Sequence, residues 1–334
     1  MGLCGSKLDD ETPARQTKQR RETFAMGLIT DLDTASKEVK VDGTLDWRAL
    51  FQRALLVRDA DGRYSVEWHD AVTITTDINE EGRGFELSEL AWFQGRLLTF
   101  DDRTGMVFEL TNFEFHATGP LQATPLMAIK AGDGSVEKGA KNEWATVKGD
   151  VLYVGSHGVN WAPGGVIEND YHRWVAQLSS LDAPRIDHVN WSARFDAVQT
   201  ALGASGYVIH EAVEWSEQLQ KWVLLPRRVS DEAFSDEVDA VKGSNKLVLA
   251  SEDFDDIEVR NVGAVVPERG YASFKFVPGT NDRVIAALKS VEDNVAGMQT
   301  TFLSVLDVAT GSVLLPDTEV PGGYKFEGLV FLQP

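Results

Sequence analysis

The stretch AWFQGRLLTF, residues 91–100, is typical of a β-hairpin. Short runs of apolar and aromatic residues flank Gln94-Gly95, and a glycine at that place suits the positive backbone φ of a tight two-residue turn. The pattern recurs at 145–154, 215–225 and 274–288, and a last apolar run stands at 328–332. Recurrence at a long period indicates a repeat architecture built from β-sheets.

An oxygen-bearing residue stands close to the start of each repeat. We call these the hub residues, and they are Ser88, Glu143, Glu211, Ser273 and Glu327. Their spacing fits a four-stranded propeller blade, which takes about 40 to 50 residues plus loops. The sequence therefore predicts an all-β fold, a five-bladed β-propeller.

The last repeat holds a single strand, so the ring needs a strand from elsewhere to complete it. The first apolar run, at 27–30, fits that place, and pairing of the two ends of the chain removes the free edges. We expect the propeller to occupy residues 26–334. Residues 1–25 lack hydrophobic periodicity, which is typical of a flexible tether. The best helix candidates are 44–56 and 191–202.

The innermost strands of a propeller surround a central channel, so equivalent positions on the five blades converge there. Carboxylates brought together in this way repel one another unless a cation neutralises them. Three glutamates and two serines offer the hard oxygen ligands that suit Ca²⁺, whereas a chain with one cysteine and no paired histidines does not suit zinc. The hairpin count leaves open a register in which Glu89, rather than Ser88, is the equivalent of Glu143.

The formal net charge of the chain is −20. Such a field repels nucleic acid and anionic lipid, so we expect no nucleic-acid partner, and any phosphate site must be a local basic pocket. The sequence contains no run of about 18 apolar residues, and its first 25 residues lack the apolar core of a signal peptide.

The N-terminus reads Met1-Gly2-Leu3-Cys4-Gly5-Ser6, which fits the pattern for N-myristoylation of Gly2. Cys4 is placed to take a second acyl chain, palmitate, and two chains give stable anchoring where one does not. The pattern predicts attachment to the cytoplasmic face of a membrane.

Several short motifs together resemble one family. They are GRGFELSEL at 82–90, DDRTG at 101–105, KNEW at 141–144, IHE at 209–211, LPRR at 225–228, GAVVP at 263–267 and SFKF at 273–276. With these motifs in order over nearly all of 28–331, the chain resembles the calcium-activated nucleotidases, or soluble apyrases. The resemblance implies one Ca²⁺ in the central channel, held by the five hub residues. It also implies hydrolysis of nucleoside di- and triphosphates, with UDP and GDP usually preferred over ADP.

Phosphoryl transfer also needs cationic groups that hold the phosphates. Six basic residues lie close in sequence to the hub residues, and these candidate substrate-binding residues are Arg83, Arg103, Lys141, Arg227, Lys275 and Lys325. Asp31 and Asp33 follow the strand that closes the ring, where a carboxylate can orient or deprotonate the attacking water. We expect the catalytic role for these two, supported by three further carboxylates, Glu86, Asp101 and Asp102.

Two other interpretations are compatible with the sequence. An Asp31-x-Asp33 motif after an apolar run also fits the haloacid-dehalogenase-type phosphatases, in which the first aspartate is the nucleophile and strands alternate with helices. The other alternative is a lipid-anchored propeller that serves as a binding platform without enzymatic activity. Members of the resembled family act in secretory lumens or outside cells, so either location is the alternative to the cytoplasmic membrane face.

Overall fold

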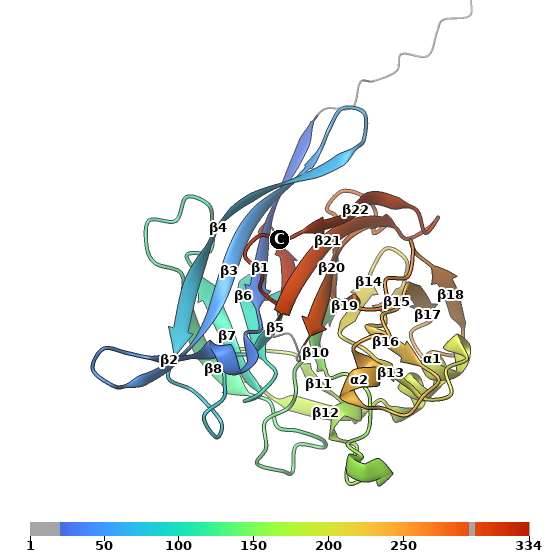
Figure 1. Cartoon of the computed structure of the whole chain (residues 1–334), viewed down its shortest axis with the longest axis horizontal. Coiled ribbons are helices and arrows are strands. Elements are labelled where there is room, and N and C mark those ends of the chain that lie inside the picture. The colour runs from blue at the N-terminus through green and yellow to red at the C-terminus, as the bar shows by residue number, and fades with distance from the viewer. Residues whose placement is uncertain (1–20, 294–297, 334) are drawn as a thin grey trace, which may run out of the picture.

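The computed structural model describes residues 21–293 and 298–333. Most of these residues lie in antiparallel strands, and five sheets follow one another around the molecule as the blades of a propeller (Figure 1). The predicted all-β, five-bladed fold is confirmed. The alternation of strands and helices that a haloacid-dehalogenase-type fold requires is not found in this part of the chain.

Four of the blades are meanders whose strands pair in chain order from the channel outward. The blades consist of β5 (Leu87–Phe93), β6 (Arg96–Asp101), β7 (Met106–Thr111) and β8 (Gln122–Ala128); β9 (Trp144–Lys148), β10 (Val151–Gly155), β11 (Trp174–Leu178) and β12 (Ile186–Asn190); β14 (Ala212–Ser216), β15 (Lys221–Leu225), β17 (Lys246–Ala250) and β18 (Ile257–Asn261); and β19 (Gly270–Phe276), β20 (Val284–Asp293), β21 (Met298–Asp307) and β22 (Val313–Glu319). The hairpin at 91–100 is β5 and β6, and its turn residues Gln94 and Gly95 have φ angles of 50° and 75°.

The fifth blade joins the two ends of the chain. It consists of β23 (Phe326–Phe331), β1 (Glu22–Thr30), β3 (Leu45–Arg58) and β4 (Tyr64–Thr76), with the short β2 (Lys37–Val39) beside the start of β3. β1 and β23 are antiparallel, with Met26 opposite Phe331 and Leu28 opposite Leu329. Because β23 also contacts both β5 and β19, the circle of innermost strands is complete, and the predicted closure by the terminal strands is confirmed.

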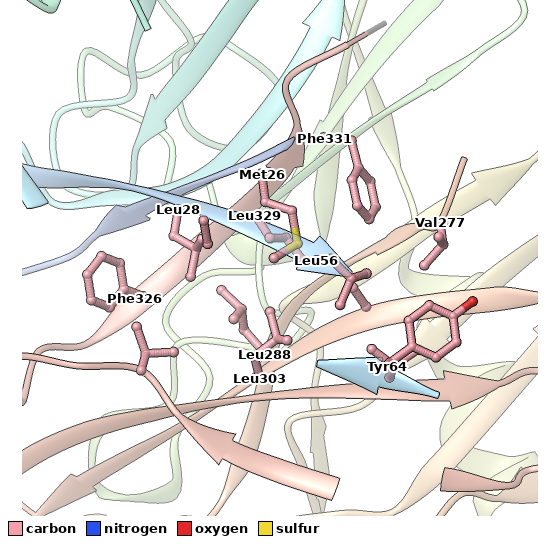
Figure 2. Packing of buried hydrophobic residues seen from close by; sticks show 14 of the residues in the cluster. Met26, Leu28, Leu56, Tyr64, Val277, Leu288, Leu303, Phe326, Leu329 and Phe331 are labelled. Carbon is pink, nitrogen blue, oxygen red and sulfur yellow. The ribbon is translucent and has the colours of Figure 1, made fainter. Parts of the chain in front are cut away.

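The packing between this closing blade and its neighbour shows why the pairing is specific. Alternate residues of β1 and β23, among them Leu28 and Leu329, are fully buried against Leu288 and Leu303 of the preceding blade (Figure 2). A shift of one residue in register would turn these side chains to the opposite face of the sheet. The closure is thus determined by the side chains as well as by backbone hydrogen bonds.

The start of the folded part differs from the one expected. β1 begins at Glu22, so residues 22–25 belong to the sheet, although the sequence predicts that the folded part starts at Met26. Residues 1–20 of the predicted tether, with Gly2 and Cys4, lie outside the described residues. None of the helices in the described part is both long and apolar enough to cross a membrane.

The helix predicted at 44–56 is wrong, because this segment is the strand β3. Its residues Trp47, Ala49 and Phe51 are buried in one core cluster, and Ala54 and Leu56 are buried in the cluster on the other side of the sheet. A strand with both faces buried has a nearly continuous apolar sequence, which periodicity does not distinguish from a buried helix.

The helix predicted at 191–202 is confirmed as α1 (Ser192–Leu202), which ends at Gly203 with a φ of 70°. The remaining elements are short: α2 (Asp236–Asp239), the 3₁₀ turns η1 (Asp33–Ser36), η2 (Pro163–Gly165) and η3 (Tyr171–Arg173), and a two-stranded sheet of β13 (Tyr207–Ile209) and β16 (Arg228–Ser230).

Candidate active site

The hub residues lie on all five innermost strands or directly before them. Ser88, Ser273 and Glu327 are in β5, β19 and β23, whereas Glu143 and Glu211 immediately precede β9 and β14. Four of the five are buried, and the side chain of Glu211 is 13% exposed. The propeller therefore gathers one oxygen-bearing residue from each blade around the channel, as the repeat predicts.

The three hub glutamates influence one another. Arg227 donates a hydrogen bond of 2.7 Å to Glu211 and lies 3.5 Å from Glu327. Burial, together with the charge of Glu143, raises the pKa of Glu211 to about 7 although Arg227 opposes the shift. Burial and the charge of Glu211 also hold the pKa of Glu327 well above its ordinary value. The cations around Glu211 and Glu327 therefore do not fully offset the effect of burial on these two carboxylates.

The two hub serines differ in their hydrogen bonds. Ser273 donates a hydrogen bond to Glu89, with 3.0 Å between the hydroxyl and Oε2. Burial raises the pKa of Glu89 to about 8. The hydroxyl of Ser88 is buried without a hydrogen-bond partner. Both side chains of β5 therefore stay candidate ligands, because Glu89 contacts another hub residue and the hydroxyl of Ser88 is unpaired.

Three further carboxylates converge where β1 ends. Oxygens of Asp31, Asp33 and Glu86 lie within 4.8 Å of one another, and we call this group the acidic triad. Asp31 accepts a hydrogen bond of 2.7 Å from the backbone N–H of Asp33, which has a φ of 47°. Burial raises the pKa of Asp33, and the charge of Asp31 adds to the effect. Both predicted catalytic aspartates therefore share one site with Glu86.

Two cations hold the acidic triad. Lys325 lies 2.6 Å from Asp31 and 2.9 Å from Asp33, and its side chain is only 5% exposed. Arg83 forms a forked pair with Glu86, at 2.9 and 2.5 Å, and lies 3.7 Å from Asp33. Lys325 comes from the segment directly before β23, so the triad is adjacent to the hub.

The neighbouring aspartates, Asp101 and Asp102, have different surroundings. Asp101 accepts hydrogen bonds from the backbone of Phe85 and from Thr104, so it fixes the turn after β6. Asp102 pairs with Lys141, which also lies 2.6 Å from Glu143. Burial raises the pKa of Asp102 well above its ordinary value, and one of its oxygens has no partner. Asp102 therefore belongs to the site, whereas the contacts of Asp101 are structural.

The other two predicted substrate-binding residues are not brought to this group. Arg103 lies 3.4 Å from Glu80 and 3.5 Å from Glu81, in the loop before β5. Lys275 pairs with Glu89 at 3.2 Å and with Glu214, and with Glu214 it lines a cavity of about 340 Å³ on the far side of the hub. The structure thus brings together Arg83, Lys141, Arg227 and Lys325.

The donor set fits a hard divalent cation. The site contains an excess of buried carboxylates over cations, and burial raises the pKa values of Glu89, Glu211 and Glu327. The buried hydroxyl of Ser88 and an oxygen of Asp102 have no partner. Oxygen ligands with unbalanced negative charge are what Ca²⁺ prefers.

Sequence reasoning missed two residues of the site, both at the end of the β20–β21 hairpin. Glu292 lies 3.3 Å from Arg227 and 3.4 Å from Lys325. Gln299, directly opposite Glu292 in the sheet, donates a hydrogen bond of 3.1 Å to Asp33. Neither residue belongs to a motif. The signal that could have indicated them is the length of β20, which extends past the start of the hub strand β19 and so reaches the site.

Comparisons with known proteins agree with this architecture. The family model described as Apyrase matches residues 32–332. The chain is 40% identical to a soluble calcium-activated nucleotidase 1 of Rattus norvegicus over 92% of its own length and 74% of that protein. It is 38% identical to apyrase apy-1 of Caenorhabditis elegans over 92% and 84% of the two chains. It is 33% identical to an apyrase of Phlebotomus duboscqi over 99% and 94%.

Proposed function

Because this chain belongs to the apyrase family, we propose that it hydrolyses the phosphates of nucleoside di- and triphosphates in the presence of Ca²⁺, with UDP and GDP preferred over ADP. One observation carries the proposal. Arg83, Lys141, Arg227 and Lys325 meet buried carboxylates from several blades at a single place, although the surface as a whole is strongly acidic. The four cations offer donors to phosphate oxygens at this place, and a bound Ca²⁺ would offset the excess of carboxylates around them.

The four cations are suited to bind and orient the phosphates. Arginine offers a planar fork of donors to phosphate oxygens, and lysine offers a compact charge. Both kinds of group are held here by carboxylates, so little ordering is needed when substrate arrives. Phosphoryl transfer depends chiefly on such positioning and on charge stabilisation.

The acidic triad is suited to orient the attacking water. Asp33 is its accessible member, with 30% of its side chain exposed, compared with 2% for Asp31 and for Glu86. Burial also raises the pKa of Asp33, which makes it a stronger base than an ordinary aspartate. We assign the role of general base to Asp33, while Asp31 orients it and holds Lys325.

The hub residues Ser88, Glu143, Glu211, Ser273 and Glu327, together with Glu89, would hold Ca²⁺. When bound, the ion would supply positive charge that stabilises the phosphate oxygens and the leaving group. The proposal rests on the acidity and burial of these side chains and on the name of the relative from Rattus norvegicus.

Phosphate release from UDP, GDP and ADP tests the proposed function. Purified protein is assayed across a calcium titration, with a chelator and with Mg²⁺ alone as controls. We expect release that depends on Ca²⁺ and ranks UDP and GDP above ADP. The absence of release at millimolar calcium would instead support the binding platform without enzymatic activity.

Membrane attachment through Gly2 and Cys4 stays a prediction of the sequence.

A further inference from the structure

We propose that Glu292 is a positioning residue that fixes the spacing of Arg227 and Lys325, the two most deeply buried cations of the site. The inference rests on the proposed phosphohydrolase function. It concerns a residue outside the hub, the acidic triad and every sequence motif.

Glu292 bridges the two cations with separate oxygens. Oε2 lies 3.3 Å from Nη2 of Arg227, and Oε1 lies 3.4 Å from Nζ of Lys325. Within residues 21–293 and 298–333, Glu327 is the other carboxylate that contacts both cations, and it does so with a single oxygen at 3.5 and 3.8 Å. Glu292 therefore bridges Arg227 and Lys325 with one carboxylate oxygen on each.

The two carboxylates lie at different depths. The side chain of Glu327 is 6% exposed, whereas that of Glu292 is 25% exposed. Glu327 belongs to the hub, and Glu292 is the more exposed of the two. Arg227 and Lys325 are each only 5% exposed and are held between these two layers.

β20 supports this arrangement with a second contact. Ser290, two residues before Glu292 and so on the same face of the strand, accepts a hydrogen bond of 2.8 Å from Arg227. The guanidinium is thus attached to β20 at two points. Because β20 is paired along its length with β21, the position of Glu292 is set by the sheet and not by a free loop.

The pKa of Glu292 is shifted in the opposite direction from those of Asp33, Glu211 and Glu327. Although burial opposes the shift, the charges of Lys325 and Arg227 lower the pKa of Glu292 to about 2. Burial instead raises the pKa of Asp33, Glu211 and Glu327. Glu292 is therefore ionised at every pH at which an enzyme is assayed, which suits a permanent anchor and not a group that accepts a proton.

Removal of this anchor should affect the rate more than substrate binding. Misplacement of a catalytic group by about 1 Å costs as much as 100-fold in rate. We expect Glu292→Gln to lower kcat by about 10- to 100-fold with less than a threefold change in KM, because its amide can accept from one cation but not from both. Glu292→Asp, which keeps the charge on a shorter chain, should recover part of kcat.

The experiment compares wild type, Glu292→Gln and Glu292→Asp in steady-state kinetics with UDP over a range of pH. Glu258→Gln is the matched control, because it removes one carboxylate from an ion pair with Arg260 on β18 of another blade. A positioning role predicts an acidic limb of the pH profile that keeps its midpoint while kcat falls. Melting temperatures of all variants show whether each remains folded.

If the wild-type chain is active, three outcomes would overturn the assignment. An unchanged kcat would show that the bridge is not needed, and a lower KM at unchanged kcat would show that Glu292 merely competes with phosphate for the cations. Loss of the acidic limb would identify Glu292 as the base. A wild-type chain that releases no phosphate would overturn the proposed function and this assignment with it, whereas the other outcomes leave that function intact.

Discussion

Single cations of the site contact carboxylates from more than one blade. Arg227 lies directly before β16 and contacts glutamates that come from beside β14, from β20 and from β23. Lys325 joins the closing strand to the acidic triad in the same way. Because each cation is shared, the loss of one carboxylate alters the position and charge of its neighbours, and effects of mutations here will not be additive.

Glu211→Gln tests the hub at the level of one ligand. We expect loss of nearly all activity and a smaller gain in melting temperature upon addition of Ca²⁺, because the variant removes a charged oxygen from a shared ion site. Phosphate release and differential scanning fluorimetry measure the two effects. Glu258→Gln serves as the control with one surface carboxylate fewer. A fully active Glu211→Gln protein would contradict the hub hypothesis.

Asp33→Asn tests the assignment of the base. Removal of a general base costs about 10²- to 10⁴-fold in rate, so kcat should fall within that range. The acidic limb of the kcat profile should also disappear, because the amide does not titrate. Asp42→Asn, an exposed position in the turn after β2, should leave both quantities unchanged. Retention of the acidic limb in Asp33→Asn would assign the base to another carboxylate.

At the scale of elements, hairpins were predictable and one long strand was not. The turn at Gln94 and Gly95 is coded by its two residues, which adopt positive φ angles. β3 contains no such local signal, because its apolar residues are distributed over two core clusters that form only after the neighbouring sheets pack against it. Its secondary structure is thus decided by tertiary contacts that the local sequence does not show.

The closing pair of strands carries the next prediction. Leu329 of β23 is fully buried in the cluster between the closing blade and the β19–β22 blade (Figure 2). Leu329→Ala should lower the free energy of unfolding by about 2 to 5 kcal/mol, since it removes a buried side chain and leaves a cavity. Urea denaturation measures the loss. Val313→Ala, at an exposed position of β22, should cost far less. Equal losses for the two variants would show that the closure contributes little to stability.

At the scale of the whole molecule, the repeat predicted which residues surround the channel but not how deep each one lies. A strand advances by about 3.3 Å per residue, so Lys275 lies about 7 Å further along β19 than Ser273. Lys275 therefore pairs with Glu89 and Glu214, and it does not join the group of cations beside the acidic triad. Proximity in sequence to a hub residue was too coarse a criterion to separate these two levels.

The buried carboxylates around the channel make the free energy of unfolding depend on pH. Burial raises the pKa of Glu211 to about 7 and that of Glu89 to about 8, from an ordinary value of 4.5. A carboxyl with a raised pKa in the folded state binds its proton more tightly there than in the unfolded chain. Without a metal ion, these groups therefore favour folding at low pH, and their contribution is lost as the pH rises from about 4.5 through 7 and 8.

Calcium should reverse this loss, because its binding becomes more favourable as the carboxylates give up their protons. We expect the melting temperature in chelator to fall between pH 5 and pH 8, and the gain upon addition of millimolar Ca²⁺ to be small at pH 5 and larger at pH 8. Differential scanning calorimetry at both pH values, with Mg²⁺ as the control ion, measures the difference. An equal gain at the two pH values would mean that the ion does not bind among Glu89, Glu211 and their neighbours, since only ligands that titrate in this range can link calcium to pH.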